Sequence, residues 1–228
     1  MPASIYPSTI KFLKDLSKNN NRDWFNAHEQ AYQNAHQNMC SFIDQLIIEM
    51  NKHDELDNVS GKKSLFRIYN DVRFSKDKSP YNPRFAFSLR RSTKFKRGGY
   101  YFNLKPGNSY LACGFFNPNP ADLNRIRADI SYNYSHWNKL LKSKGIAVNY
   151  GALTGSTVTT SPRGFDIKHP AIELLRHKQF ILRHNFTDAE ITSTGFLKEV
   201  NKTYKAVRPF FDYMSEVLTT DANGVLVV

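Results

Sequence analysis

Four consecutive segments between residues 66 and 116 have the pattern of strands with one apolar face, and this pattern restricts the fold more than any other feature of the chain. The segments are 66–74, 84–90, 100–105 and 109–116. Such alternation places successive side chains on opposite faces of an extended strand. The turn residues Pro106-Gly107-Asn108 favour a hairpin between the last two segments. The pattern therefore predicts an antiparallel meander.

Helical patterns lie on both sides of this meander. Apolar residues recur every three to four positions over residues 10–16 and again over residues 24–50. Asn119-Pro120 predicts a helix start, and Thr187 with Glu190 predicts a capping box at the start of a C-terminal helical region. Both ends of the chain are therefore predicted to be helical.

A fifth strand is predicted at residues 179–186, where QFILRHNF alternates. Hydrophobic residues make up 40% of the chain and aromatic residues 14%, which argues against a disordered protein. No linker separates two parts of the sequence. We therefore expect residues 1–228 to form a single α+β domain, with a mainly antiparallel sheet of about five strands flanked by N-terminal and C-terminal helices.

Positive charge is concentrated in one segment. The chain has a net charge of +12, and residues 62–97 contain twelve Lys or Arg against two Asp, which gives that segment +10. A focused basic region attracts nucleic acid, phosphorylated ligands or acidic proteins. The alternative is a solvated surface with a flexible basic turn.

The sequence also bears on location and on metals. No apolar run is long enough to span a bilayer, and residues 1–16 lack the pattern of a signal peptide, so we expect a cytoplasmic protein with no membrane partner. Cys40 and Cys113 are expected to be buried free thiols. No Cys/His pair has the spacing of metal ligands, so no metal site is predicted.

Five motifs occur in a fixed order along the chain. They are NNNRDWF (19–25), FRIYNDVRFSKDKSPY (66–81), GGYYFNLKPG (98–107), PNPADLNRIRADI (118–130) and SPRGFDIKHPAIELLRHKQF (161–180). Together they resemble a family of uncharacterised bacterial and fungal proteins, domain of unknown function 2461, from about residue 8 to residue 218. The resemblance implies a single-domain protein and brings no established reaction. Asn82 departs from the family pattern, which more usually has a basic residue there.

Arginines on predicted strands are the first candidates for a site. A guanidinium group offers a planar fork of donors that suits phosphate or carboxylate. If segments 66–74 and 84–90 pair, the polar faces that carry Arg67, Arg73 and Arg84 combine, and segment 100–105 adds polar residues to the same sheet. The predicted ligand-binding residues are Arg67, Tyr69, Arg73, Lys76, Lys78, Tyr81 and Arg84. The alternative is a structural network in which Asp71 and neighbouring carboxylates neutralise the arginines.

The loop SKDKSPYNP (75–83) also has two interpretations. Lys76 and Lys78 suit a phosphate, and Asp77 suits proton transfer. Alternatively, the loop is an ordered turn in which Ser75 or Asp77 caps backbone amides.

The catalytic candidates are Asp71, Asp77 and His169. Asp166 and His169 have the spacing of an acid–base pair in which the carboxylate orients the imidazole. Alternatively, His169 caps the helix that Pro170 begins.

Two classes of function remain. The first is a binding module or enzyme for a phosphate- or carboxylate-bearing small molecule, using the Arg/Tyr/Asp face and the adjoining loop. The second is a nucleic-acid or acidic-protein interaction module that uses residues 62–97. No nucleophile–base pair or cofactor fingerprint is present, so the sequence names no reaction, cofactor or oligomeric state and leaves enzyme and binding functions both open.

Overall fold

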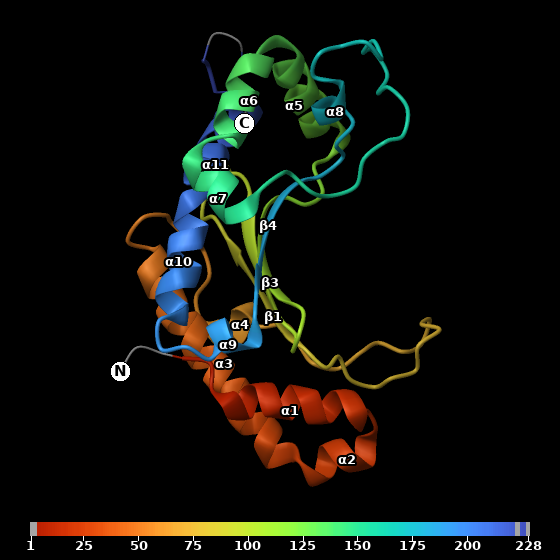
Figure 1. Ribbon diagram of the computed structural model, residues 1–228, viewed down its shortest axis with the longest axis vertical. Helices are drawn as coiled ribbons and strands as arrows, with labels where there is room; N and C mark the ends of the chain where they lie inside the picture. Colours follow the sequence, from red (N-terminus) through yellow and green to blue (C-terminus); the bar gives the residue numbers. More distant parts are fainter. Residues whose placement is uncertain (1–3, 222–223, 227–228) are drawn as a thin grey trace. The chain divides into compact units, whose positions relative to one another are not determined.

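The computed structural model describes residues 4–221 and 224–226, and it contains helices and one antiparallel sheet (Figure 1). The strands are β1 (Phe85–Arg90), β2 (Gly99–Leu104), β3 (Ser109–Phe115) and β4 (Phe180–Phe186), in the order β1-β2-β3-β4. The predicted α+β class is confirmed. The sheet has four strands rather than about five.

The missing strand is the one predicted over residues 66–74, and that prediction is wrong. Tyr69 forms an isolated bridge to Tyr81. The residue beside Tyr81 is Pro80, which has no N–H to continue a ladder of hydrogen bonds. Phe74, which the alternation places on the apolar side of this segment, is 94% exposed. The chain meets the sheet at an isolated bridge between Leu65 and Phe87 of β1. Beyond the second bridge, at Tyr69, the segment continues as a loop.

The hairpin of β2 and β3 follows the prediction. Its turn closes with a hydrogen bond of 2.8 Å from Asn108 N–H to the carbonyl oxygen of Lys105. Gly107 has φ of 73°, a conformation that glycine adopts without steric cost. Tyr100 and Phe102 of β2 are buried at 1% and 0% exposure, so the apolar face of the strand packs as the alternation predicts.

The helices also agree with the sequence in most places. They are α1 (Pro7–Lys18), α2 (Arg22–Ala27), α3 (Glu29–Met50), α4 (Gly61–Ser64), α5 (Pro120–Tyr132), α6 (Tyr134–Leu141), α7 (Lys144–Tyr150), α8 (Ile172–Leu175), α9 (Asp188–Ile191), α10 (Phe196–Ala206) and α11 (Arg208–Thr219). Asn119 caps α5, and the capping box of Thr187 and Glu190 is confirmed. The continuous helix predicted over residues 24–50 is interrupted at His28, whose φ of −117° is not helical.

The chain divides into two compact units. Unit 1 contains Met1–Leu89, Tyr101–Leu111 and Asn185–Lys202, and unit 2 contains Arg90–Tyr100, Ala112–His184 and Thr203–Val228. Each unit is thus assembled from three stretches of the chain. The single-domain organisation stays a prediction.

Aromatic rings fill the core of unit 1. Phe102 of β2 lies 5.3 Å from Phe87 of β1 and 5.9 Å from Phe196 of α10, measured between ring centroids. Phe42 of α3 stacks on Phe196 at 5.8 Å. Buried aromatic pairs of this kind add stabilisation beyond the area they bury.

Unit 2 has an aromatic core of its own around Trp137 of α6. The Trp137 ring meets Phe210 of α11 edge-on at 6.2 Å. Tyr100 packs against Phe211 at 5.1 Å. Cys113 is buried in this unit and Cys40 in unit 1, both as free thiols, as predicted. Within the residues that the structure describes, no helix is both long and apolar enough to cross a membrane.

The contacts of Asp188 predict that the stability of unit 1 falls in acid. Its carboxylate accepts a hydrogen bond from Gly107 N–H at 2.9 Å and pairs with Lys14 at 2.8 Å, and these contacts lower the pKa of Asp188. A carboxyl group whose pKa is lower in the folded state stabilises the fold above its unfolded pKa of about 4, and this stabilisation is lost as the pH falls toward the folded pKa. We expect Asp188→Asn to lose about 1 kcal/mol of unfolding free energy at pH 7 and less at pH 3.

Urea unfolding at both pH values measures this difference. The control is Asp57→Asn, because Asp57 is exposed and makes no side-chain hydrogen bond or ion pair in the described part of the chain. Equal losses for Asp188→Asn at pH 7 and pH 3 would contradict the expectation.

Candidate functional site

Side-chain contacts within the loop over residues 70–79 hold this loop together. Arg73 donates to both carboxylate oxygens of Asp71, from Nε at 3.0 Å and from Nη2 at 2.7 Å. This contact lowers the pKa of the exposed Asp71 carboxyl. Lys78 Nζ donates to the carbonyl oxygen of Val72 at 2.9 Å. Arg73 and Lys78 therefore already have partners, which favours the structural interpretation for both residues.

Asp77 caps a backbone amide within this loop, as the turn interpretation predicts. Its carboxylate accepts a hydrogen bond of 2.9 Å from Ser79 N–H, which lowers the pKa of Asp77. Arg67 and Lys76 are exposed, and neither makes a side-chain hydrogen bond or ion pair in the described part of the chain. Their cationic groups are open to solvent.

The two tyrosines of the predicted site lie in different surroundings. Tyr81 is 4% exposed, and its ring stacks on Phe25 of α2 at 4.0 Å. Burial raises the pKa of Tyr81. Tyr69 lies beside it, with 5.4 Å between ring centroids, and is 50% exposed. Tyr81 thus belongs to the core, and Tyr69 lies at its edge.

Arg84 is the centre of a polar group that we call the Arg84 cluster, made of Arg84, Asn82, Tyr101 and Asn103. Arg84 Nη1 donates to Tyr101 OH at 2.6 Å and to Asn103 Oδ1 at 2.8 Å. Its Nε donates to Asn82 Oδ1 at 3.2 Å. Arg84 is half-buried and Asn103 is 3% exposed. Neighbouring side chains of β2 and the residues just before β1 thus hold the guanidinium group in place.

The acceptors in this cluster are all neutral. Among the described residues, no carboxylate lies within ion-pair distance of Arg84, and its Nη2 atom donates no hydrogen bond. A partly desolvated cation without a counter-charge is costly, and it gains most from an anion that supplies the missing charge and acceptors. Arg84 therefore has the geometry of an anion-binding group.

Two arginines of unit 2 show the opposite arrangement. The side chain of Arg91 is 1% exposed and pairs with Asp212 at 2.9 Å. Arg97 pairs with Asp122. These two members of the basic segment 62–97 are neutralised within the fold, so formal charge overstates the positive surface of this segment.

A polar hollow of about 570 Å³ adjoins the Arg84 cluster. It is lined by Ser17, Asn20, Asn70, Asp71, Ser75, Asp77, Ser79, Tyr81, Asn82, Pro83 and Lys105. Asn82 belongs to both features, because it lines the hollow and accepts the hydrogen bond from Arg84. The hollow is rich in hydroxyl, amide and carboxylate groups, which suits a ligand that carries hydroxyl groups.

His169 lies in unit 2, and the structure gives its ring a local role. Its Nδ1 accepts a hydrogen bond from Ala171 N–H at 3.1 Å, and Nε2 lies 2.9 Å from Ser131 Oγ. The Asp166 carboxylate accepts from Lys168 N–H at 2.7 Å. The helix α8 begins at Ile172 and not at Pro170, and its N-cap residue Ala171 receives no side-chain cap, so His169 binds the backbone before the helix and does not cap it. The acid–base role of His169 stays a prediction.

The structure brings together residues that sequence reasoning did not combine. Alternation places Tyr101 and Asn103 on the polar face of their strand, but it does not identify them as partners of Arg84. The signal was the presence of an amide and a phenol at positions two apart on a strand that follows an arginine-bearing strand. In the sequence, Asn82 stands out only as a departure from the family pattern.

Comparisons with known proteins give one match. The model of a family described as conserved hypothetical protein (DUF2461) matches residues 8–213. No curated protein and no solved structure matches the chain. Among the described residues, no group of three or more His, Cys, Asp or Glu is placed to hold a metal ion.

Proposed function

This chain belongs to the DUF2461 family of conserved hypothetical proteins, and since that description names no activity, we propose a function from the geometry: unit 1 binds a phosphate- or carboxylate-bearing small molecule at the Arg84 cluster. The observation that carries the proposal is the half-buried guanidinium group of Arg84, whose hydrogen bonds go to neutral acceptors alone. The Nη2 donors remain for the anion. The proposal extends to binding and names no reaction.

Charges around the hollow support this assignment. Asp71 is paired with Arg73 and Asp77 with a backbone N–H, so both carboxylates are partly compensated. Lys105 lines the hollow and makes no side-chain hydrogen bond or ion pair in the described part of the chain. A ligand that reaches from Arg84 into the adjoining hollow would therefore meet a second cation there.

Replacing Arg84 tests the proposal. We expect Arg84→Gln to weaken binding of inorganic phosphate, pyrophosphate or citrate by about 10- to 100-fold, the value of a charge-assisted hydrogen bond to a bound anion. Arg84→Lys is expected to recover part of the loss, because it restores the charge but not the fork. Isothermal titration calorimetry measures both variants.

The matched control is Arg73→Gln, because Arg73 is an arginine of the same region that already pairs with Asp71. It is expected to bind the anions as the unaltered protein does. Equal affinities of the Arg84→Gln variant and the unaltered protein, or no anion binding by either, would contradict the proposal.

A second candidate function is an interaction surface for nucleic acid or an acidic protein. Phe74 favours it, because this ring is 94% exposed beside Arg73 in a loop that also carries Lys76. Exposed rings among cations suit single-stranded nucleic acid. This surface predicts that oligonucleotide binding falls steeply with salt and is lost in Phe74→Ala, while Arg84→Gln leaves it unchanged.

A further inference from the structure

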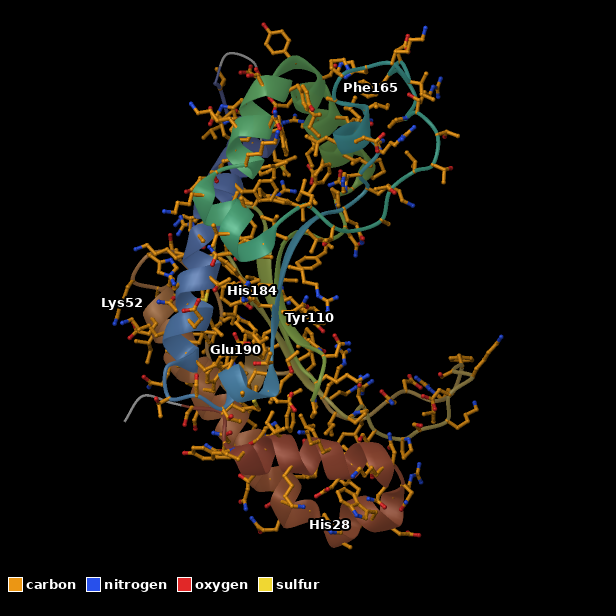
Figure 2. All side chains as sticks on the ribbon, viewed as in Figure 1. His28, Lys52, Tyr110, Phe165, His184 and Glu190 are labelled. Atoms are coloured by element: carbon orange, nitrogen blue, oxygen red, sulfur yellow. The ribbon has the colours of Figure 1, made fainter. Side chains whose placement is uncertain are left out.

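Three aromatic rings of unit 1 lie in a row beside the Arg84 cluster. The ring centroids of Phe66 and Tyr101 are 6.3 Å apart, and those of Tyr101 and Tyr110 are 6.0 Å apart. Phe66 is 48% exposed, and Tyr101 and Tyr110 are half-buried. Tyr110 projects from β3 (Figure 2). We call these three residues the aromatic row.

The aromatic row and the Arg84 cluster have one residue in common, Tyr101. Tyr101 is the middle ring of the row, and its hydroxyl group accepts the 2.6 Å hydrogen bond from Arg84. A ligand bound to Arg84 therefore lies next to aromatic surface, and Phe66 offers the most exposed part of that surface. Aromatic side chains beside an arginine bind planar rings by stacking while the guanidinium group holds an anion.

Asn82 adds hydrogen-bond donors between Arg84 and the polar hollow. Its Oδ1 accepts from Arg84, while its Nδ2 donates no hydrogen bond in the described part of the chain. The side chain is half-buried and faces the polar hollow. Its amide group is placed to donate to a hydroxyl or carbonyl oxygen of a ligand that spans the cluster.

From this arrangement we propose that the ligand of the Arg84 cluster is a nucleoside phosphate, with its phosphate on Arg84, its sugar toward the hollow and its base against the aromatic row. This inference rests on the anion site proposed above and specifies what the anion is attached to. A free nucleotide and a unit of single-stranded nucleic acid present the same chemistry. A sugar phosphate lacks the planar ring that the row would contact.

The test compares ligands that differ by one part. Adenosine 5′-monophosphate, uridine 5′-monophosphate, ribose 5-phosphate and inorganic phosphate are titrated into the full chain by calorimetry. We expect at least one nucleotide to bind about tenfold or more tightly than ribose 5-phosphate, because stacking of the base adds affinity. Phe66→Leu is expected to remove that difference and to leave ribose 5-phosphate binding unchanged.

Two further variants complete the design. Arg84→Gln is expected to weaken nucleotides and ribose 5-phosphate alike. Phe95→Leu is the matched control, because it removes an exposed phenylalanine outside the row and is expected to change neither affinity. Circular dichroism confirms that each variant is folded.

The possible outcomes distinguish the nucleotide inference from the proposed anion site on which it rests. If ribose 5-phosphate binds through Arg84 but the nucleotides bind no more tightly and Phe66→Leu has no effect, the nucleotide inference is overturned and the anion site stands. If no phosphate compound binds, or Arg84→Gln has no effect, both are overturned. A single-stranded hexanucleotide that binds more tightly than the mononucleotides, with the same dependence on Phe66 and Arg84, identifies nucleic acid as the source. If the hexanucleotide binds no more tightly than the mononucleotides, the ligand is a free nucleotide.

Discussion

Gly114→Ala is expected to lower the free energy of unfolding by about 4 kcal/mol or more, out of the roughly 5–15 kcal/mol that stabilises a typical domain. A Cβ atom at Gly114 would lie 2.0 Å from the carbonyl oxygen of Phe180 and 3.0 Å from Cα of Ile181. Both obstacles are backbone atoms of β4, so a side-chain rotation cannot relieve them. Gly114 also has φ of 144°, which residues with a Cβ atom rarely adopt.

Urea unfolding of the variant, or its yield as folded protein, measures the effect. The control is Gly145→Ala in α7, where the nearest atom to the added Cβ is 3.6 Å away. Alanine favours helix over glycine by about 1 kcal/mol, so this control is expected to be neutral or slightly stabilising. A Gly114→Ala protein with the unfolding midpoint of the unaltered chain would contradict the account of β3 and β4.

Asp129→Ala is expected to lower the free energy of unfolding by about 2–4 kcal/mol, because it leaves one buried donor and two half-buried donors without their acceptor. The Asp129 carboxylate accepts from the Trp137 indole N–H and from Tyr213 OH, each at 2.6 Å, and from Asn133 Nδ2 at 2.7 Å. Trp137 is fully buried. Burial, with the hydrogen bond to Asp129, raises the pKa of Tyr213 well above its ordinary value.

A double-mutant cycle isolates this network. Tyr213→Phe is expected to cost about 1 kcal/mol in the unaltered protein, the worth of one hydrogen bond. In the Asp129→Ala background the same substitution is expected to cost almost nothing, because the hydroxyl group has already lost its acceptor. Additive losses would show that Asp129 and Tyr213 act independently.

Local signals in the sequence predicted much of the fold. The capping box of Thr187 and Glu190 depends on residues three apart, so it can be recognised from the chain alone. The hairpin around Gly107 is equally local. Segment 66–74 shows the limit of such reasoning. The segment does alternate, but strand pairing also depends on the residues of the segment opposite it. Pro80 in that opposite segment has no N–H to donate.

The candidate site could be predicted only in part, for a similar physical reason. Sequence chemistry identifies arginine as an anion ligand, but it does not say which arginine has a carboxylate nearby. Asp71 and Arg73 meet because of a turn between them, and Arg91 meets Asp212 because α11 packs against its segment. Arg84 differs from Arg73 and Arg91 because its partners Tyr101 and Asn103 are neutral, and this makes it the candidate anion-binding residue.

The division of unit 1 into three stretches of chain has a consequence for synthesis. Its core pairs Phe42 and Phe102 with Phe196, so a growing chain cannot complete this core until residues 185–202 have left the ribosome. Contacts between residues so distant in sequence slow folding, because a long loop must close before they form. A nascent chain halted before residue 185 would therefore expose the Phe42 and Phe102 rings, which makes it a substrate for chaperones.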